Sequence, residues 1–119
     1  MRLSPGVRRQ PLLLLGSTFP RASIAALVAE LLDSEAYGHT SEYLGEYEQI
    51  VVGDASVRIR DNADPMYREG DADDERFAFP RYSDFRTIVE IESSGLARQF
   101  LERVRGRNEL RVLESTHAA

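Results

Sequence analysis

A short, uninterrupted apolar run near the N-terminus limits what this chain can fold into. Residues 12–15 are four consecutive leucines between Pro11 and Gly16. The run is far shorter than the ~18 apolar residues that cross a membrane, and polar residues end it before it reaches signal-peptide length. A continuous apolar run of this size is typical of a strand that is buried on both faces. The fold is therefore expected to place this segment in the interior of a sheet.

Two segments have the apolar periodicity of amphipathic helices. Ser23 is positioned to cap a helix over residues 24–32, and Ser94 is positioned to cap a second helix. Gly106 provides a left-handed residue at the end of the second helix. The apolar faces are predicted to carry Ile24, Leu27, Val28, Leu31 and Leu32 in the first helix, and Leu96, Phe100 and Val104 in the second.

Alternating apolar and charged residues predict further strands. Residues 56–60 and 87–92 both alternate in this way, and pairing them would set arginines across from glutamates. Residues 49–52 precede the first of these stretches, so residues 49–60 form either a tight hairpin or one bulged strand. Leu110 and Val112 alternate with charged residues in a last strand.

The order of these elements predicts an α+β fold. A strand, a helix, one or two strands, a strand, a helix and a strand favour a ferredoxin-like two-layer sandwich, with a four- or five-stranded, mainly antiparallel sheet and two helices on one face. Residues 37–47 contain two glycines and no clean period, so they are expected to be irregular. We expect a flexible arm at 1–10, one domain at 11–114 and a flexible tail at 115–119. The predicted core joins residues 12–15 and the first helical face to Val57, Ile59, Val89, Ile91, Phe100, Val104, Leu110 and Val112.

The composition excludes several kinds of catalysis. The chain has no cysteine, and all 15 of its basic residues are arginine, which removes thiol nucleophiles, zinc-thiolate sites and lysine Schiff bases. His39 and His117 lie in no hydrolase or zincin motif. We therefore expect no enzymatic activity and no cofactor.

An acid-rich segment between the predicted strands invites a metal interpretation. An EF-hand loop that began at Asp71 would need glycine and glutamate where the chain has Arg76 and Tyr82. Residues 61–75 are accordingly predicted to be a solvated loop without regular structure and without a divalent ion.

The net charge of −5 is distributed unevenly. Residues 1–32 carry a charge of +3, residues 33–75 carry −10, and residues 76–119 carry +2. Such an acidic middle repels nucleic acid and anionic membranes and attracts basic proteins. We expect a soluble, cytoplasmic protein with a basic protein partner, although charge of this kind also serves solubility alone.

Tyrosines alternate with acids in this middle part, which is typical of a protein-binding surface. Tyrosines that cover a sheet with wet hydroxyls are the alternative interpretation. The predicted partner-binding residues are Glu42, Tyr43, Glu46, Tyr47, Asp71, Asp73 and Asp74.

A family resemblance accompanies these patterns. Asp61, Asn62 and Asp64, the Phe-x-Phe-Pro-x-Tyr stretch at 77–82, and the Ile-Val-Glu-Ile-Glu strand follow one another. This layout, over residues 48–113, resembles small uncharacterised bacterial proteins, some of them immunity-type partners of secreted toxins. The resemblance implies a binding module that neutralises a basic toxin. The alternative is a small-ligand-binding regulatory or sensor domain, because ferredoxin-like domains often pair into homodimers and bind metabolites at the seam.

Overall fold

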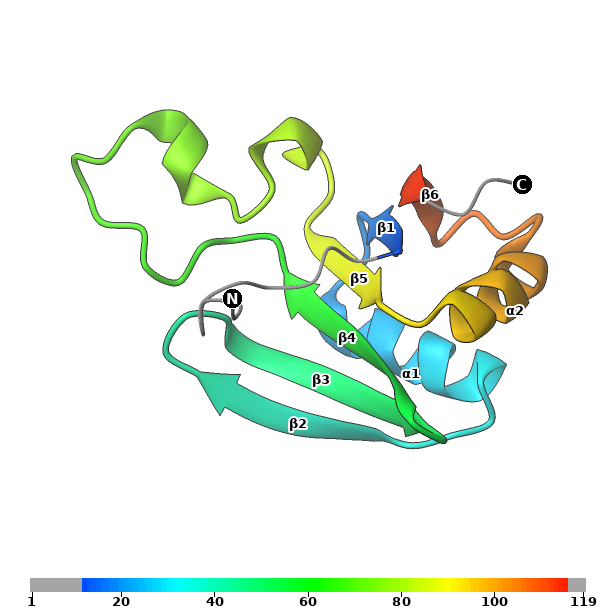
Figure 1. Ribbon diagram of the computed structural model, residues 1–119. Coiled ribbons are helices and arrows are strands. Elements are labelled where there is room, and N and C mark those ends of the chain that lie inside the picture. The colour runs from blue at the N-terminus through cyan, green and yellow to red at the C-terminus, as the bar shows by residue number, and fades with distance from the viewer. Residues whose placement is uncertain (1–11, 116–119) are drawn as a thin grey trace, which may run out of the picture.

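Six antiparallel strands form one sheet in the computed structural model, which describes residues 12–115 (Figure 1). The strand order is β2-β3-β4-β5-β1-β6, and within the described range two helices accompany the sheet. The α+β class and the antiparallel pairing are thus as predicted. The elements are β1 (Leu13–Ser17), α1 (Arg21–Leu31), β2 (Ala36–Ser41), β3 (Gly45–Val52), β4 (Ala55–Asp61), β5 (Thr87–Ile91), α2 (Ser94–Val104) and β6 (Arg111–Ser115), with short 3-10 turns at Asp73–Arg76 and Pro80–Tyr82.

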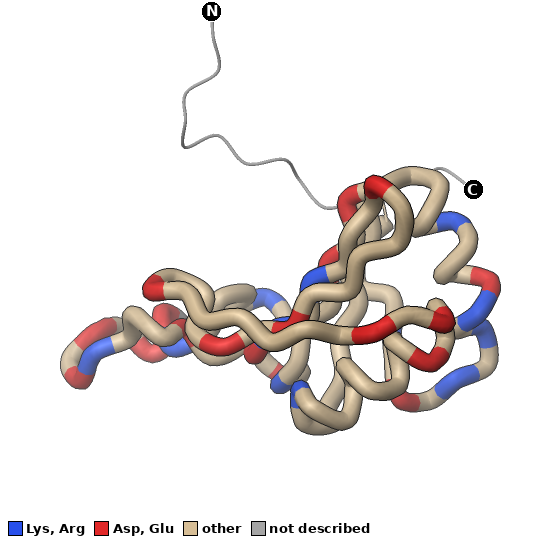
Figure 2. Tube along the Cα trace, turned by 90° about the horizontal axis from the view of Figure 1, so that it is seen from below, with Lys and Arg blue, Asp and Glu red and all other residues tan. Residues whose placement is uncertain are grey.

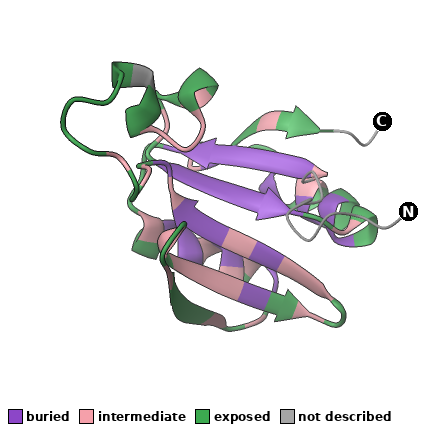
Figure 3. Cartoon of the chain, turned by 60° about the vertical axis from the view of Figure 1, so that its left-hand side comes forward, coloured by how far each residue is buried: buried purple, intermediate pink, exposed green. Residues whose placement is uncertain are grey.

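Residues 13–15 of the apolar run begin β1, and their predicted burial on both faces is confirmed, whereas Leu12 precedes the strand and is partly buried. Every residue of β1 and of its neighbour β5 is buried, so both strands are purple along their length in Figure 3. Leu13 pairs with Ile91, which confirms that this strand lies beside the 87–92 segment. Ser115 belongs to β6, whereas the predicted arm and the rest of the predicted tail lie outside the described residues.

The strand count exceeds the predicted four or five because residues 37–47 are not irregular. They form most of β2 and the start of β3, joined by a turn in which Gly45 has a φ of 71°. β2 is an edge strand and is largely exposed. An exposed edge strand needs no apolar alternation, so the pattern that identifies the inner strands is missing here.

The open alternative at residues 49–60 is decided in favour of a tight hairpin. Val52 of β3 pairs with Ala55 of β4, and Gly53 and Asp54 form the two-residue turn between them. The φ of Gly53 is 64°, a conformation that glycine adopts without strain.

Both helices begin earlier than the predicted caps indicate. α1 starts at Arg21, so Ser23 lies inside the helix instead of capping it, and the N-cap residue is Pro20. The extended backbone of Pro20 directs the chain into the helix, and its carbonyl accepts the N–H of Ile24 at 3.1 Å. Because proline has no side-chain group that caps a helix, the start of α1 carries no capping pattern in the sequence.

The second helix differs from the prediction by one residue. Ser93, not Ser94, caps α2, and its hydroxyl oxygen accepts the N–H of Leu96 at 3.3 Å. Gly106 follows the helix with a φ of 82°, which confirms its predicted left-handed role.

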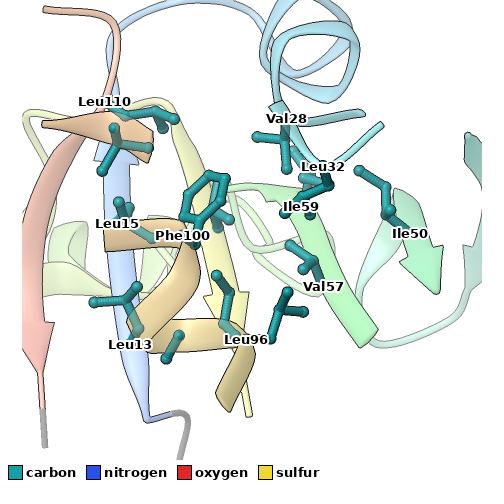
Figure 4. Packing of buried hydrophobic residues seen from close by; sticks show 14 of the residues in the cluster. Leu13, Leu15, Val28, Leu32, Ile50, Val57, Ile59, Leu96, Phe100 and Leu110 are labelled. Carbon is teal, nitrogen blue, oxygen red and sulfur yellow. The ribbon is translucent and has the colours of Figure 1, made fainter. Parts of the chain in front are cut away.

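One hydrophobic cluster joins both helices to the sheet (Figure 4). Phe100 of α2 is fully buried at its centre, near leucines of β1. The core prediction needs correction at four positions: Val112 is 42% exposed, and Leu12, Leu27 and Leu31 are only partly buried. Val112 lies on β6 at the sheet edge, where alternation does not guarantee cover.

The long connection between β4 and β5 packs against the other face of the sheet. A Cβ atom at Gly16 of β1 would lie 2.8 Å from the Phe85 ring and 2.8 Å from the Leu113 side chain. The guanidinium of Arg60 lies 5.7 Å from the centre of the Phe79 ring. These contacts explain how the middle of the sheet is buried on the face that the helices do not cover.

Candidate protein-interaction surface

A largely buried arginine gathers carboxylates at the start of α1. Arg21 donates to Asp61 Oδ2 at 2.5 Å, to Glu48 Oε1 at 2.8 Å and to Glu46 Oε1 at 3.2 Å. Burial lowers the pKa of Arg21, but the charges and hydrogen bonds of Asp61 and Glu48 outweigh it, so this pKa lies above its ordinary value. Part of the negative charge in the middle of the sequence is therefore used inside the fold.

A buried asparagine fixes the β4–β5 loop, residues 62–86. Asn62 is fully buried, and its amide nitrogen donates to the carbonyls of Tyr82 and Phe85, both at 2.9 Å. Its amide oxygen accepts the N–H of Phe79 at 2.8 Å. One side chain thus ties three distant backbone positions together, which gives a loop with little regular structure a defined path.

The β2–β3 turn carries the most exposed tyrosine of the predicted surface. Glu42 and Tyr43 lie in this turn, and Tyr43 is 71% exposed. The Ser41 hydroxyl accepts the N–H of Tyr43 at 3.2 Å, which holds the turn. Gly45 lies beside Pro65, since a Cβ atom at Gly45 would be in van der Waals contact with that ring at 3.5 Å. The turn and the start of the β4–β5 loop therefore meet at one end of the sheet (Figure 1).

The acids of the β4–β5 loop are exposed, and local contacts shape their backbone. Asp71 accepts the N–H of Arg68 at 2.9 Å, and Asp73 lies 3.7 Å from the guanidinium of Arg76. Asp74 falls in the 3-10 turn Asp73–Arg76, and its side chain is outside the described part of the structure. This turn corrects the prediction that residues 61–75 lack all regular structure.

Glu46 and Tyr47 are neighbours in β3, so they point to opposite faces of the sheet. Glu46 faces Arg21, whereas the Tyr47 ring stacks on His39 with ring centres 5.3 Å apart. The guanidinium of Arg58 lies 5.8 Å from the Tyr47 ring centre. Tyr47 is thus part of a polar sheet face, apart from Tyr43 in the turn.

The same polar face bears out one predicted pairing. Arg58 lies opposite Glu90 in the β4–β5 register, and their side chains are 3.3 Å apart. They border a hollow of about 60 Å³, room for a few water molecules but too small for a substrate. In residues 12–115, no group of three or more His, Asp or Glu side chains could hold a metal ion.

We use the name acidic end for the surface that the turn and the loop form together. Red segments mark the acids along the loop that projects to the left in Figure 2, with blue arginine segments among them. Met66 adds a 42% exposed apolar side chain to this end. The acidic end comprises Glu42, Tyr43, Asp64, Met66, Asp71 and Asp73.

Two organising residues escaped the sequence analysis. Arg21 and Asn62 both act through partners far away in the sequence, and only the Asp-Asn-x-Asp spacing marked Asn62 at all.

The acidic end combines exposed acids with an exposed aromatic side chain, an arrangement that can attract and hold a basic protein surface.

Comparisons with protein-family models, curated proteins and solved structures found no match to this chain. Among the described residues, no helix is long and apolar enough to span a bilayer.

Proposed function

We propose that this chain is a protein-binding module whose acidic end recognises a basic surface of a partner protein. The observation that carries the proposal is the 71% exposed Tyr43 ring in a turn that packs beside the acid-rich loop. A large exposed ring offers contact area at low entropic cost, and the carboxylates of the adjacent Glu42 and of the β4–β5 loop select a positively charged partner.

The contacts within the fold reduce the number of residues that are available to bind the partner. Glu46 shares the Arg21 guanidinium, and Tyr47 stacks on His39, so both have partners within the chain. Tyr43 is the proposed anchor, and the exposed acids Asp71 and Asp73 supply the field that steers the partner. Neutralisation of a secreted basic toxin, as in immunity-type proteins, is the biological form that the family resemblance implies.

The fold supports a further part of the proposal. Strands β4, β5, β1 and β6 with the two helices have the strand order of a ferredoxin-like sandwich, and β2 and β3 extend it at one edge. We infer that this extension is a hairpin added to a ferredoxin-like unit. The added hairpin places the turn that carries Tyr43 beside the start of the β4–β5 loop.

The test starts by capturing partners with the immobilised chain from a lysate of its native host. A captured basic protein is then produced in pure form, and its association and dissociation rates are measured at two salt concentrations. The triple variant Asp71→Asn, Asp73→Asn, Asp74→Asn should slow association and flatten its salt dependence, because these charges attract the partner while it is still diffusing towards the chain. Tyr43→Ala should instead speed dissociation at least tenfold, because the tyrosine ring would hold the complex together only once it is buried against the partner.

Tyr37→Ala is the matched control. Tyr37 is also exposed, at 58%, but it lies at the opposite end of β2. The proposal is wrong if the captured protein is acidic, or if Tyr37→Ala and Tyr43→Ala change the dissociation rate equally. A melting temperature that rises with a metabolite instead of a protein would favour the small-ligand alternative.

A further inference from the structure

A wide groove runs between α2 and β6, away from the acidic end. Its volume is about 910 Å³, near the upper limit for ligand-binding cavities in proteins. Apolar side chains from the helix, the following loop and the strand line it, among them Leu101, Leu110 and the 42% exposed Val112. A contiguous exposed apolar surface with a polar rim is typical of an interaction site, whereas single exposed apolar residues are common on any protein.

The charge of the groove is opposite to that of the whole chain. Four arginines and one glutamate line it, although the chain has a net charge of −5. Two of these arginines are 3.3 and 3.7 Å from neighbouring glutamates. Arg98 and Arg111 form no ion pair within residues 12–115, so they have capacity for carboxylates from outside.

The groove also borders an edge of the sheet. β6 is the last strand in the order, and within the described residues it is hydrogen-bonded to β1 on one side only. The outer side of an edge strand presents N–H and C=O groups that an added strand can pair with.

We propose that an extended acidic segment of another protein binds here by adding a strand beside β6. Its backbone pairs with the outer edge of β6, and alternate apolar side chains enter the groove against Leu110 and Val112. Because successive side chains of a strand point to opposite faces, its carboxylates lie on the other face of the sheet, where the pairing of Gly16 with Arg111 places the Arg111 side chain. This site is separate from the acidic end, because its partner carries the opposite charge.

The probe is a fluorescein-labelled peptide of alternating residues, Glu-Val-Glu-Leu-Glu-Val-Glu, whose binding to the full chain is followed by fluorescence anisotropy. A peptide with lysine in place of each glutamate should bind at least tenfold more weakly. Two further peptides carry N-methyl groups on alternate backbone nitrogens, one on the odd and one on the even positions. Strand addition requires that one of them loses binding, because only one set of nitrogens faces β6.

Variants of the chain locate the contact. Arg111→Glu should weaken binding of the acidic peptide at least tenfold, while its melting temperature remains near that of the parent. Arg68→Glu makes the same charge change in the β4–β5 loop and should alter binding less than twofold. Equal binding of the lysine peptide, or equal effects of Arg68→Glu and Arg111→Glu, would overturn the proposal. It is also overturned if both N-methylated peptides bind like the parent peptide.

Discussion

Replacement of Asn62 by alanine is expected to release the β4–β5 loop from the sheet. The alanine variant loses two hydrogen bonds of 2.9 Å to backbone carbonyls and one of 2.8 Å from a backbone N–H. A buried hydrogen bond stabilises a fold by about 1 kcal/mol net, and a buried partner left unpaired costs about 1–3 kcal/mol. Because the loop lies at the surface, water can reach some of the freed groups. The expected loss in free energy of unfolding is therefore about 2–4 kcal/mol.

Thermal and urea unfolding, both followed by circular dichroism, measure this loss. For a domain of this size about 1 kcal/mol corresponds to roughly 4 °C, so the melting temperature should fall by roughly 8–16 °C. Hydrogen exchange adds a local readout. The N–H groups of Ala78 and Phe79, which bond to the backbone and side-chain oxygens of Asn62, should lose protection before those of β5.

Two further variants test whether the effect comes from the buried amide group of Asn62. Asn108→Ala changes the chain's other asparagine, which is exposed, and should alter the free energy of unfolding by less than about 0.5 kcal/mol. Asn62→Asp keeps the size but cannot donate to the Tyr82 and Phe85 carbonyls, so it should destabilise the fold at least as much as alanine. A harmless Asn62→Asp variant would refute the reasoning, because it would mean that donation to these carbonyls contributes nothing.

Further predictions concern the core and the C-terminal strand. Ile91→Ala should cost about 2–5 kcal/mol in urea unfolding, and Leu27→Ala should cost clearly less, because Ile91 is fully buried and Leu27 only partly; the reverse order would contradict the observed packing. The hydrogen bond from the Tyr82 hydroxyl to Glu114 raises the pKa of Tyr82, so the folded chain holds this proton more tightly than the unfolded chain. The stability from this bond is present below the unfolded pKa of about 10 and is lost as the pH rises above it, so the parent should lose more stability than Tyr82→Phe between pH 9 and 11. Parallel pH profiles for the two proteins would argue against this contribution.

Periodicity was sufficient to predict the parts of the fold that pack against the core. The residues of β1 and β5 are mostly apolar, and each helix has one apolar face, because these residues pack in the interior. The edge strand β2 has no such requirement, and its Tyr37, Gly38 and His39 are all exposed. That is why its position in the sheet could not be predicted, and why the number of strands was underestimated.

The candidate surface was predictable in composition but not in arrangement. Tyrosines and acids between residues 42 and 48 are visible in the sequence, yet their division between the turn and two sheet faces depends on where β3 begins. Arg21 lies 25 residues or more from each of its three carboxylate partners, and a contact at such separation leaves no local pattern. For the same reason, nothing near Asn62 indicated that it would fix the loop.

The spatial arrangement changes what the charge distribution means. Along the chain, the strongly acidic middle segment stands between two weakly basic ones, but Arg21 offsets part of the acid at the start of α1. Exposed acids are concentrated on the β4–β5 loop, among them Glu69, Asp71 and Asp73, whereas Arg98 and Arg111, which form no ion pair within residues 12–115, line the groove beside α2. Charges are screened over about 8 Å at physiological salt, whereas the molecule extends over 42 Å, so neither region cancels the field of the other. A basic protein at the acidic end and an acidic segment at the groove would therefore bind independently, and saturating one site should leave the affinity of the other unchanged.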